Sequence, residues 1–225
     1  ASQFVQCLSD AAYFESVSFT TDDIRRKAQY AANEQRDALQ VVTGSVAEYL
    51  ASLQMTMQTR AFDAVDLPRI AQLTNKTNQF NTTTRRRTLE EIRHIASAPD
   101  ILTLQVRLSD RFGDNGLVSA VIMKPSGAAE DTYDIDSWVM SCRVFGRQLE
   151  HAILNTLVTI ATEANAKFLI ATYKPTPKNM VIKNLFAELG FELLIEKKSA
   201  PSNETHWRLD LKQYCDHTTQ IDSKG

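Results

Sequence analysis

The sequence predicts an α/β (α+β) fold, with a mixed, mostly antiparallel, twisted sheet that is flanked by helices. Three strand-like segments, 102–108, 117–123 and 133–140, are joined by short turns, which indicates an antiparallel meander. The third segment leads into apolar residues at helical spacing over 149–161, and another strand-like segment follows at 168–173. Hydrophobic residues make up 43% of the chain, which is enough for a core.

The first 54 residues are expected to form a helical linker from a preceding domain. Residues 1–20 are mixed and aromatic, and we interpret them as the end of a preceding element or as a short docking segment. Thr20 or Thr21 offers a helix N-cap, and the charged segment up to Gln40 has only a thin apolar stripe, which is typical of a solvated helix. A second short helix is expected over 46–53.

A strand at 55–62 begins the main domain, which is expected to span 55–212. Asp66-Leu67-Pro68 then starts a helix, because proline is tolerated in a first turn. This helix runs into the tract 72–87, which is rich in amides, hydroxyls and arginines. Such side chains donate and accept hydrogen bonds, so the tract could bind a small polyhydroxylated or acyl substrate. A frayed helix end with a polar turn and a solvated basic run is the alternative.

The remaining elements follow from caps and turn residues. Thr88-Leu89-Glu90-Glu91 predicts a capping box and a helix to about Ala98. Gly190 stands where the residue after a helix is often left-handed, and it should end a helix over 179–189. The other predictions are a turn at 110–116, strands at 192–197 and 206–211 with a polar turn at 199–204 between them, and a polar, mobile tail at 213–225.

Composition excludes several functions. The net charge of −2 gives no basic field for nucleic acid, and no apolar run is long enough to cross a membrane. Cys7, Cys142 and Cys215 are far apart and odd in number, so they predict neither a disulfide framework nor a zinc site, and no metal is expected. A reducing cytoplasmic location is the default expectation.

The loop Cys142–Gln148 is the first candidate site. It joins the third meander strand to the central helix and carries one thiol, Arg143, Arg147 and Gly146. A helix start presents unpaired N–H groups, and arginines recognise phosphate in a bidentate manner. The loop therefore predicts a phosphate or pyrophosphate site, with an ordinary strand-to-helix connection as the alternative.

The element order β, α, α, β, β, β, α, β, α, β, β resembles the GNAT acyltransferase fold. In this resemblance the segment 133–166 corresponds to the place where that superfamily holds the pyrophosphate of an acyl-pantetheine donor. The segment 179–191, with Asn179, Phe186 and Leu189-Gly190-Phe191, looks like a later motif of the same superfamily.

Several spaced motifs resemble a narrower family, the FkbH-like proteins, over roughly residues 14–192. These motifs are Arg69–Asn81 with Thr83-Thr84-Arg85-Arg86, Asp110–Val118, Met140–Arg147, and Tyr173-x-Pro175-Thr176-x-Lys178-Asn179. The resemblance implies a role in polyketide or related biosynthesis. FkbH-like proteins move a glyceryl unit from a phosphorylated glycolytic intermediate, through an enzyme thioester, to the phosphopantetheine arm of an acyl carrier protein.

The resemblance also implies partners. Phosphate removal in that family needs a haloacid-dehalogenase-like phosphatase domain with an Asp-x-Asp-x-Thr strand and magnesium. Asp134-Ile135-Asp136 is followed by Ser137-Trp138 and lies in the meander, so no such motif is found here. The chain therefore resembles the acyltransferase-like half alone. We expect no phosphatase activity and no tightly bound cofactor, and we expect an acyl carrier protein or CoA to supply the pantetheine.

Site roles follow from the same resemblance. Cys142 would be the thioester nucleophile, because arginines and a helix start favour the thiolate, and His151 is a possible base. Cys142 could instead be a buried small hydrophobe, with the acyl-bearing cysteine in the missing domain. The remaining roles are an acyl pocket formed by Asn75, Lys76, Asn78, Gln79 and Asn81, anion or carrier contacts of Arg85 and Arg86, phosphopantetheine contacts of Arg143, Gly146, Arg147, Tyr173 and Asn179, and a lower-ranked polar cluster of Arg111, Asp114 and Asn115.

Two other functions remain open. A non-catalytic module of the same fold would only dock the carrier protein. An acetyl-CoA-dependent N-acetyltransferase is disfavoured, because the loop keeps Arg143-x-x-Gly146 but has Gln148 where the GNAT pattern has a small residue.

Overall fold

The computed structural model describes residues 21–127, 130–194 and 204–224, with the backbone alone for 21–30. The segment 1–20, Cys7, the end of the strand expected at 192–197 and most of the turn at 199–204 lie outside the described residues. Residues 1–43 and 44–225 fall into two compact units. The first unit contains helix α2 (Thr21–Val42). No helix among the described residues is long and apolar enough to span a membrane.

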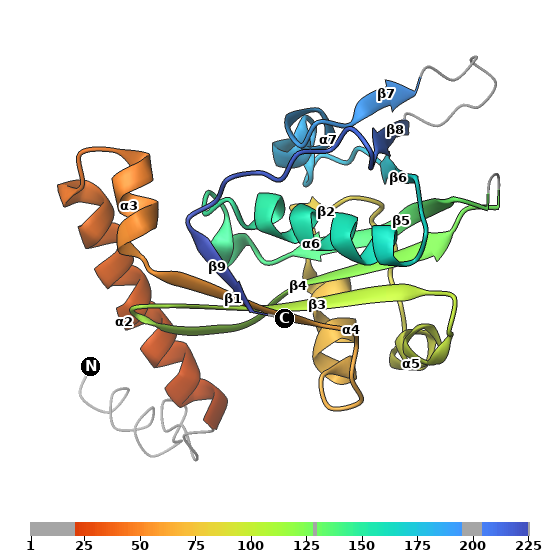
Figure 1. The fold of residues 1–225 in the computed structure, drawn as a ribbon. Coiled ribbons are helices and arrows are strands. Elements are labelled where there is room, and N and C mark those ends of the chain that lie inside the picture. The colour runs from red at the N-terminus through yellow and green to blue at the C-terminus, as the bar shows by residue number, and fades with distance from the viewer. Residues whose placement is uncertain (1–20, 128–129, 195–203, 225) are drawn as a thin grey trace, which may run out of the picture. The chain divides into compact units, whose positions relative to one another are not determined.

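The second unit carries one mixed sheet with helices on both faces (Figure 1). Its elements, in chain order, are α3 (Val46–Ser52), β1 (Met55–Arg60), α4 (Leu67–Lys76), β2 (Phe80–Asn81), α5 (Leu89–Ser97), β3 (Leu102–Asp110), β4 (Gly113–Pro125), β5 (Thr132–Met140), the 3-10 turn η1 (Cys142–Val144), α6 (Leu149–Glu163), β6 (Phe168–Tyr173), the 3-10 turn η2 (Met180–Ile182), α7 (Leu185–Glu188), β7 (Glu192–Leu194), β8 (Thr205–Asp210) and β9 (Ile221–Lys224).

The strand order is β7-β8-β6-β5-β4-β3-β1-β9, and β2 pairs with β5 outside this path. Strands β3, β4 and β5 form the predicted antiparallel meander. The pairs β5–β6 and β1–β9 are parallel, and the remaining pairs are antiparallel. The predicted fold class, a mixed and mostly antiparallel sheet flanked by helices, is confirmed.

Helices α4 and α5 cover one face of the sheet and α6 covers the other (Figure 1). Apolar side chains of α4 and α5, including Ile70 and Ile92, share a buried cluster with Ile122 of β4 and Val139 of β5. Leu149, Ile153 and Leu157 bury the inner side of α6 at helical spacing. The central strands are therefore buried on both faces.

Local signals in the sequence set several helix ends. Thr88 accepts a hydrogen bond from the backbone of Glu91, whose side chain binds back to Thr88, so the predicted capping box starts α5. Pro68 lies in the first turn of α4. Gly190 has a φ of +85°, as expected of a left-handed residue after a helix.

Some predicted boundaries are wrong. The turn expected at 110–116 is only Arg111-Phe112, because Asp110 pairs with Gly113, and Gly116 lies at a bulge of β4. The helix expected at 179–189 is broken into η2 and α7, since Ile182 and Lys183 make 3-10 hydrogen bonds to Asn179 and Met180.

Both ends of the predicted domain also change. The compact unit begins at Gly44, so α3, which was expected in the linker 1–54, belongs to the same unit as the sheet. The segment 213–225 is not a mobile tail along its described length. It contributes β9, which pairs in parallel with β1 and buries Ile221. A polar strand can join a sheet edge because its backbone makes the pairing.

Candidate functional site

The loop between β5 and α6 presents an exposed thiol. Cys142 is exposed and begins η1, directly after Ser141, whose N–H donates to the carbonyl of Val118 at 2.7 Å. Gly146 has a φ of +71°, which only glycine adopts without strain, and a Cβ built there would meet nothing within 4 Å. The loop thus holds Cys142 at the end of the central strand, open to solvent.

Arg147 stabilises this loop from inside. Its Nη1 lies 3.1 Å from Oδ2 of Asp110, whose side chain is fully buried, and its Nη2 donates to the carbonyl of Arg143 at 3.0 Å. Asn115 donates to the same carboxylate oxygen at 3.2 Å. A buried charge that is paired in this way fixes the geometry of its surroundings. The guanidinium of Arg147, which was expected to contact phosphopantetheine, therefore joins the loop to the β3–β4 turn.

Arg143 lies beside the thiol and is half-buried. Its Nε donates to Oγ of Ser141 at 3.2 Å, and its Nη2 donates to the carbonyl of Asn115 at 3.4 Å. Asn115, which the sequence placed in a lower-ranked polar cluster, thus accepts hydrogen bonds from both Arg143 and Arg147. Asp114 accepts from the backbone of Gly116, and Nη1 of Arg111 donates to the carbonyl of Ser52, so these two residues shape the turn.

In the first part of the amide-rich tract, hydrogen bonds join the end of α4 to Arg86 and Arg87 and so close a loop. The side chain of Asn75 donates to the carbonyl of Arg87 at 2.6 Å and accepts from the Arg87 N–H at 3.1 Å. Arg86 donates to the carbonyls of Thr74, Asn75 and Thr77 at the end of α4, and also to the side chain of Asn78. A guanidinium there satisfies helix carbonyls that have no intrahelical partner. Asn75 and Arg86 thus have structural contacts, whereas Lys76 and Gln79 are exposed.

The second part of the tract enters the sheet as β2, which the sequence did not predict. Phe80 pairs with Met140 and Asn81 with Val139 in an antiparallel ladder. Because the ladder is antiparallel, residues that precede Phe80 run toward the end of β5 that carries Cys142. The structure therefore brings Asn78 and Gln79 to the same end of the sheet as the thiol.

Asn179 is completely buried and joins three segments. Its Nδ2 donates to the carbonyls of Asn81 at 3.0 Å and Lys174 at 2.9 Å. Its Oδ1 accepts from the N–H of Thr176 at 2.7 Å and from the hydroxyl of Tyr173 at 3.3 Å. Burial raises the pKa of Tyr173. Tyr173 and Asn179, expected beside a pantetheine cleft, thus lie against β2.

A buried carboxylate that sequence reasoning missed lies behind the tract. Asp136 of β5 forms ion pairs with Arg85 and Arg87, and Nζ of Lys124 lies 3.6 Å from it. The Nε of Arg87 is buried and has no hydrogen-bond partner among the residues that the structure describes. A buried charge needs a partner of opposite sign. Arg85, which was expected to meet an external anion, therefore also pairs with the internal carboxylate of Asp136.

His151 contacts the C-terminal segment rather than Cys142. Its ring lies 4.7 Å from the ring of His217, and its Nδ1 is 3.7 Å from a carboxylate oxygen of Glu150. Burial is the largest cause that lowers the pKa of His151 below its ordinary value. Neither a hydrogen bond nor an ion pair joins His151 to Cys142 in the described part of the chain. The role of His151 as base for this thiol therefore has no support from the geometry.

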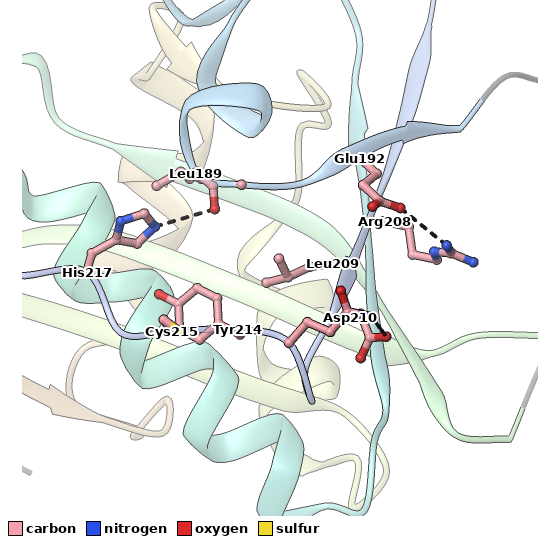
Figure 2. Close-up of a pocket in the computed structure, with 10 residues that line it drawn as sticks. Leu189, Glu192, Arg208, Leu209, Asp210, Tyr214, Cys215 and His217 are labelled. Carbon is pink, nitrogen blue, oxygen red and sulfur yellow. Dashed lines mark hydrogen bonds and ion pairs between the residues drawn. The ribbon is translucent and has the colours of Figure 1, made fainter.

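A cavity of about 230 Å³ lies between the end of α7, strands β7 and β8, and the C-terminal segment that follows β8 (Figure 2). His217 faces Leu189, with its Nε2 placed 3.4 Å from the carbonyl oxygen of Leu189 so that the protonated nitrogen donates to it. The side chain of Asn155 of α6 donates to the carbonyl of His217 and accepts from its N–H. Burial raises the pKa of Tyr214 to about 12. The exposed Cys215 lines this cavity. The C-terminal segment, which was expected to be a polar tail, is thus hydrogen-bonded to α6 through Asn155 and His217.

The comparison with family models found no match, and the comparison with curated proteins found none either. Solved structures do match. The GNAT domain of S. lividans PAT is 14% identical, with a TM-score of 0.53, over 68% of this chain and 89% of that one. The ribosomal-protein-S18-alanine N-acetyltransferase from Escherichia coli is 12% identical, with a TM-score of 0.52, over 72% and 99%.

A third match is spermidine N-acetyltransferase from Vibrio cholerae, solved with CoA and spermine. It is 14% identical, with a TM-score of 0.50, over 71% of this chain and 97% of that chain. Identities this low establish the fold alone. The element order, the β3–β5 meander and these matches together show that the chain has the GNAT acetyltransferase fold.

Proposed function

We propose that this chain is the acyltransferase-like part of an FkbH-like protein. It transfers a glyceryl unit, through a thioester on Cys142, to the phosphopantetheine thiol of an acyl carrier protein. The glyceryl unit comes from a phosphorylated three-carbon precursor, and a separate magnesium-dependent phosphatase domain removes the phosphate. The motif resemblance supplies the substrate, and the fold is that of acyltransferases.

The position of Cys142 is the observation that carries this proposal. The thiol is exposed, comes two positions after Met140, the last residue of β5, and is followed in sequence by Arg143. The β2–β5 ladder brings the amide side chains of Asn78 and Gln79 toward the same end of the sheet. Amides can hold the hydroxyl groups of a glyceryl unit next to a nucleophile.

The transfer consists of two balanced thiol exchanges. The Cys142 thiolate attacks the carbonyl carbon of an incoming glyceryl thioester, a new S–C bond forms, and the donor thiolate leaves and takes a proton from water. The thiolate of the carrier arm then attacks the same carbonyl carbon and releases Cys142.

Intact-protein mass spectrometry tests the proposal. The full chain is incubated with a glyceryl-pantetheine thioester or with glyceryl-loaded carrier protein. We expect one glyceryl adduct on the wild type and none on Cys142→Ser. Cys215→Ser is the matched control, because Cys215 is the other exposed thiol among the described residues, and this variant should keep the adduct. An adduct that survives in Cys142→Ser, or its absence from the wild type, refutes the proposal.

A carrier-docking module is the second candidate. The absence of any bond between Cys142 and His151, within the described residues, favours it, since a relay thiol usually has a nearby base. In that case Cys142→Ser leaves transfer by the intact parent protein unchanged while carrier binding persists. A CoA-dependent N-acetyltransferase, as in the spermidine enzyme, would instead acetylate amines with acetyl-CoA.

A further inference from the structure

The two central parallel strands pair over only part of their length. Thr132–Ile135 of β5 pairs with Phe168–Ala171 of β6, and the β5–β6 ladder ends there. The rest of β5 runs on to Met140, next to Cys142. A strand edge that its neighbour leaves free offers backbone N–H and C=O groups to an extended ligand that carries amides. A pantetheine arm is such a ligand.

This edge is already taken by β2 and the two residues that follow it. Besides the ladder at Met140 and Val139, the N–H of Thr82 donates to the carbonyl of Trp138 at 3.2 Å. The N–H of Trp138 donates to Oγ1 of Thr82 at 3.3 Å, and Oγ1 of Thr83 donates to the carbonyl of Asp136 at 2.9 Å.

The same segment is also bound on its other side. The N–H of Lys174, which follows β6, donates to the carbonyl of Thr82 at 2.8 Å. The side-chain amide of Asn179 donates to the carbonyl of Asn81 at 3.0 Å. Residues 80–83 therefore have partners on both edges, as an internal strand of a sheet does.

Side-chain packing fixes the segment further. Phe80, Asn81, Thr82 and Thr83 are all buried. The ring of Phe80 lies 5.6 Å from that of Trp138 and 5.9 Å from that of Phe145 in the loop after Cys142. An arm that entered along β5 would have to expel this ring, and it would leave the N–H of Lys174 without its partner, the carbonyl of Thr82.

We infer that Phe80–Thr83 is a permanent occupant of the space between β5 and β6, which excludes an extended pantetheine arm from the edge of β5. An arm that reaches Cys142 does so from the exposed side of the loop. This inference rests on the proposed function and adds the side from which the donor approaches Cys142. Phe80–Thr83 is then the segment that determines which donors fit. A donor whose affinity depends on pairing with the central strand is excluded.

Tethering the arm provides the test. Pantethine reacts by thiol–disulfide exchange: the Cys142 thiolate attacks one sulfur, a mixed disulfide forms, and one pantetheine thiol is released. The full chain with Cys7→Ser and Cys215→Ser leaves Cys142 as the only thiol. The tether holds the arm at a high effective concentration beside the end of β5. Cys142→Ser in the same background, treated identically, is the control.

Amide hydrogen exchange of the tethered and untethered chains is the readout. We expect the exchange rates at Thr82, Trp138 and Lys174 to differ by less than about twofold, because the segment stays in place. A rise of about tenfold or more at Thr82 and Lys174 would show that the arm displaces the segment, and it would overturn the inference. Failure of glyceryl transfer would leave this result unchanged, since disulfide exchange needs no acyl chemistry.

Discussion

Replacing Asn179 with leucine removes the side chain that joins β2, the segment after β6 and η2. Leucine has the same number and branching of side-chain heavy atoms as asparagine and is not smaller, so the substitution leaves no cavity and its effect comes chiefly from lost hydrogen bonds. The carbonyls of Asn81 and Lys174 and the N–H of Thr176 lose their partner. An apolar side chain cannot replace these contacts.

The expected cost follows from the exposure of the three groups. Asn81 is completely buried, so leaving its carbonyl without a hydrogen bond should cost about 1–3 kcal/mol of stability. Lys174 is exposed and Thr176 half-exposed, so water can partly replace their lost bonds, and each should cost about 0.5–1 kcal/mol. The free energy of unfolding should therefore fall by about 3 kcal/mol, which corresponds to a decrease in Tm of roughly 6–12 °C for a unit of this size.

Urea unfolding measures this change, and the fluorescence of the buried Trp138 reports it together with circular dichroism. Asn184→Leu is the matched control, since Asn184 is exposed and makes no capping bond with its side chain; we expect a change within about 0.5 kcal/mol. If Asn179→Leu destabilised the chain by less than about 1 kcal/mol, the assignment of Asn179 as the joint between these segments would be wrong.

Three further predictions concern the loop and α6. Arg147→Met should lower the free energy of unfolding by about 3–5 kcal/mol in urea titrations, because the fully buried carboxylate of Asp110 loses its charge partner; adding Asp110→Asn should recover part of this loss, and an equal or larger loss in the double variant would contradict the pairing. Gly146→Ala should cost about 1 kcal/mol in the same assay, because its φ is +71° although a Cβ meets nothing there; an unchanged midpoint would argue against the left-handed conformation. Burial lowers the pKa of His151, so between that pKa and the ordinary value of 6.5 the unfolded state binds more protons. Stability should then be fully present above about pH 6.5 and should fall as the pH drops through the lowered pKa, and His151→Leu should reduce this fall; a variant with the same pH profile as the wild type would exclude His151 as its source.

The meander and the helix starts could be predicted because their signals are local. Alternating residues and short turns over 102–140 determine β3, β4 and β5, and the Thr88–Glu91 capping box lies within one helical turn. Gly190 is a local signal of the same kind, because glycine readily adopts the left-handed conformation that ends a helix. Such patterns need no knowledge of distant residues, and consistency between them is sufficient for the fold class.

The candidate site could be predicted only in part. The sequence placed Cys142 at the end of a strand, where the structure has it, but it left open whether the thiol is buried, and the structure shows that it is exposed. For Arg147 and Asn179, residue type alone could not separate an internal partner from an external ligand. Arg147 donates a hydrogen bond to Asp110, 37 positions away, and Asn179 donates one to the carbonyl of Asn81, 98 positions away. Guanidinium and amide groups serve ligands and internal carboxylates or carbonyls equally well.

The sequence by itself determined the central strand, the helix that follows it, and the position of a cysteine between them, because periodicity and turn residues act over a few positions; the exposure of that cysteine came from the structure. Only the tertiary structure decided that part of the amide-rich tract is the internal strand β2 and that the polar C-terminal segment is the edge strand β9. Both strands are held by backbone pairing with partners far away in the chain. Backbone groups are the same in every residue, so such pairing leaves no trace in composition or periodicity.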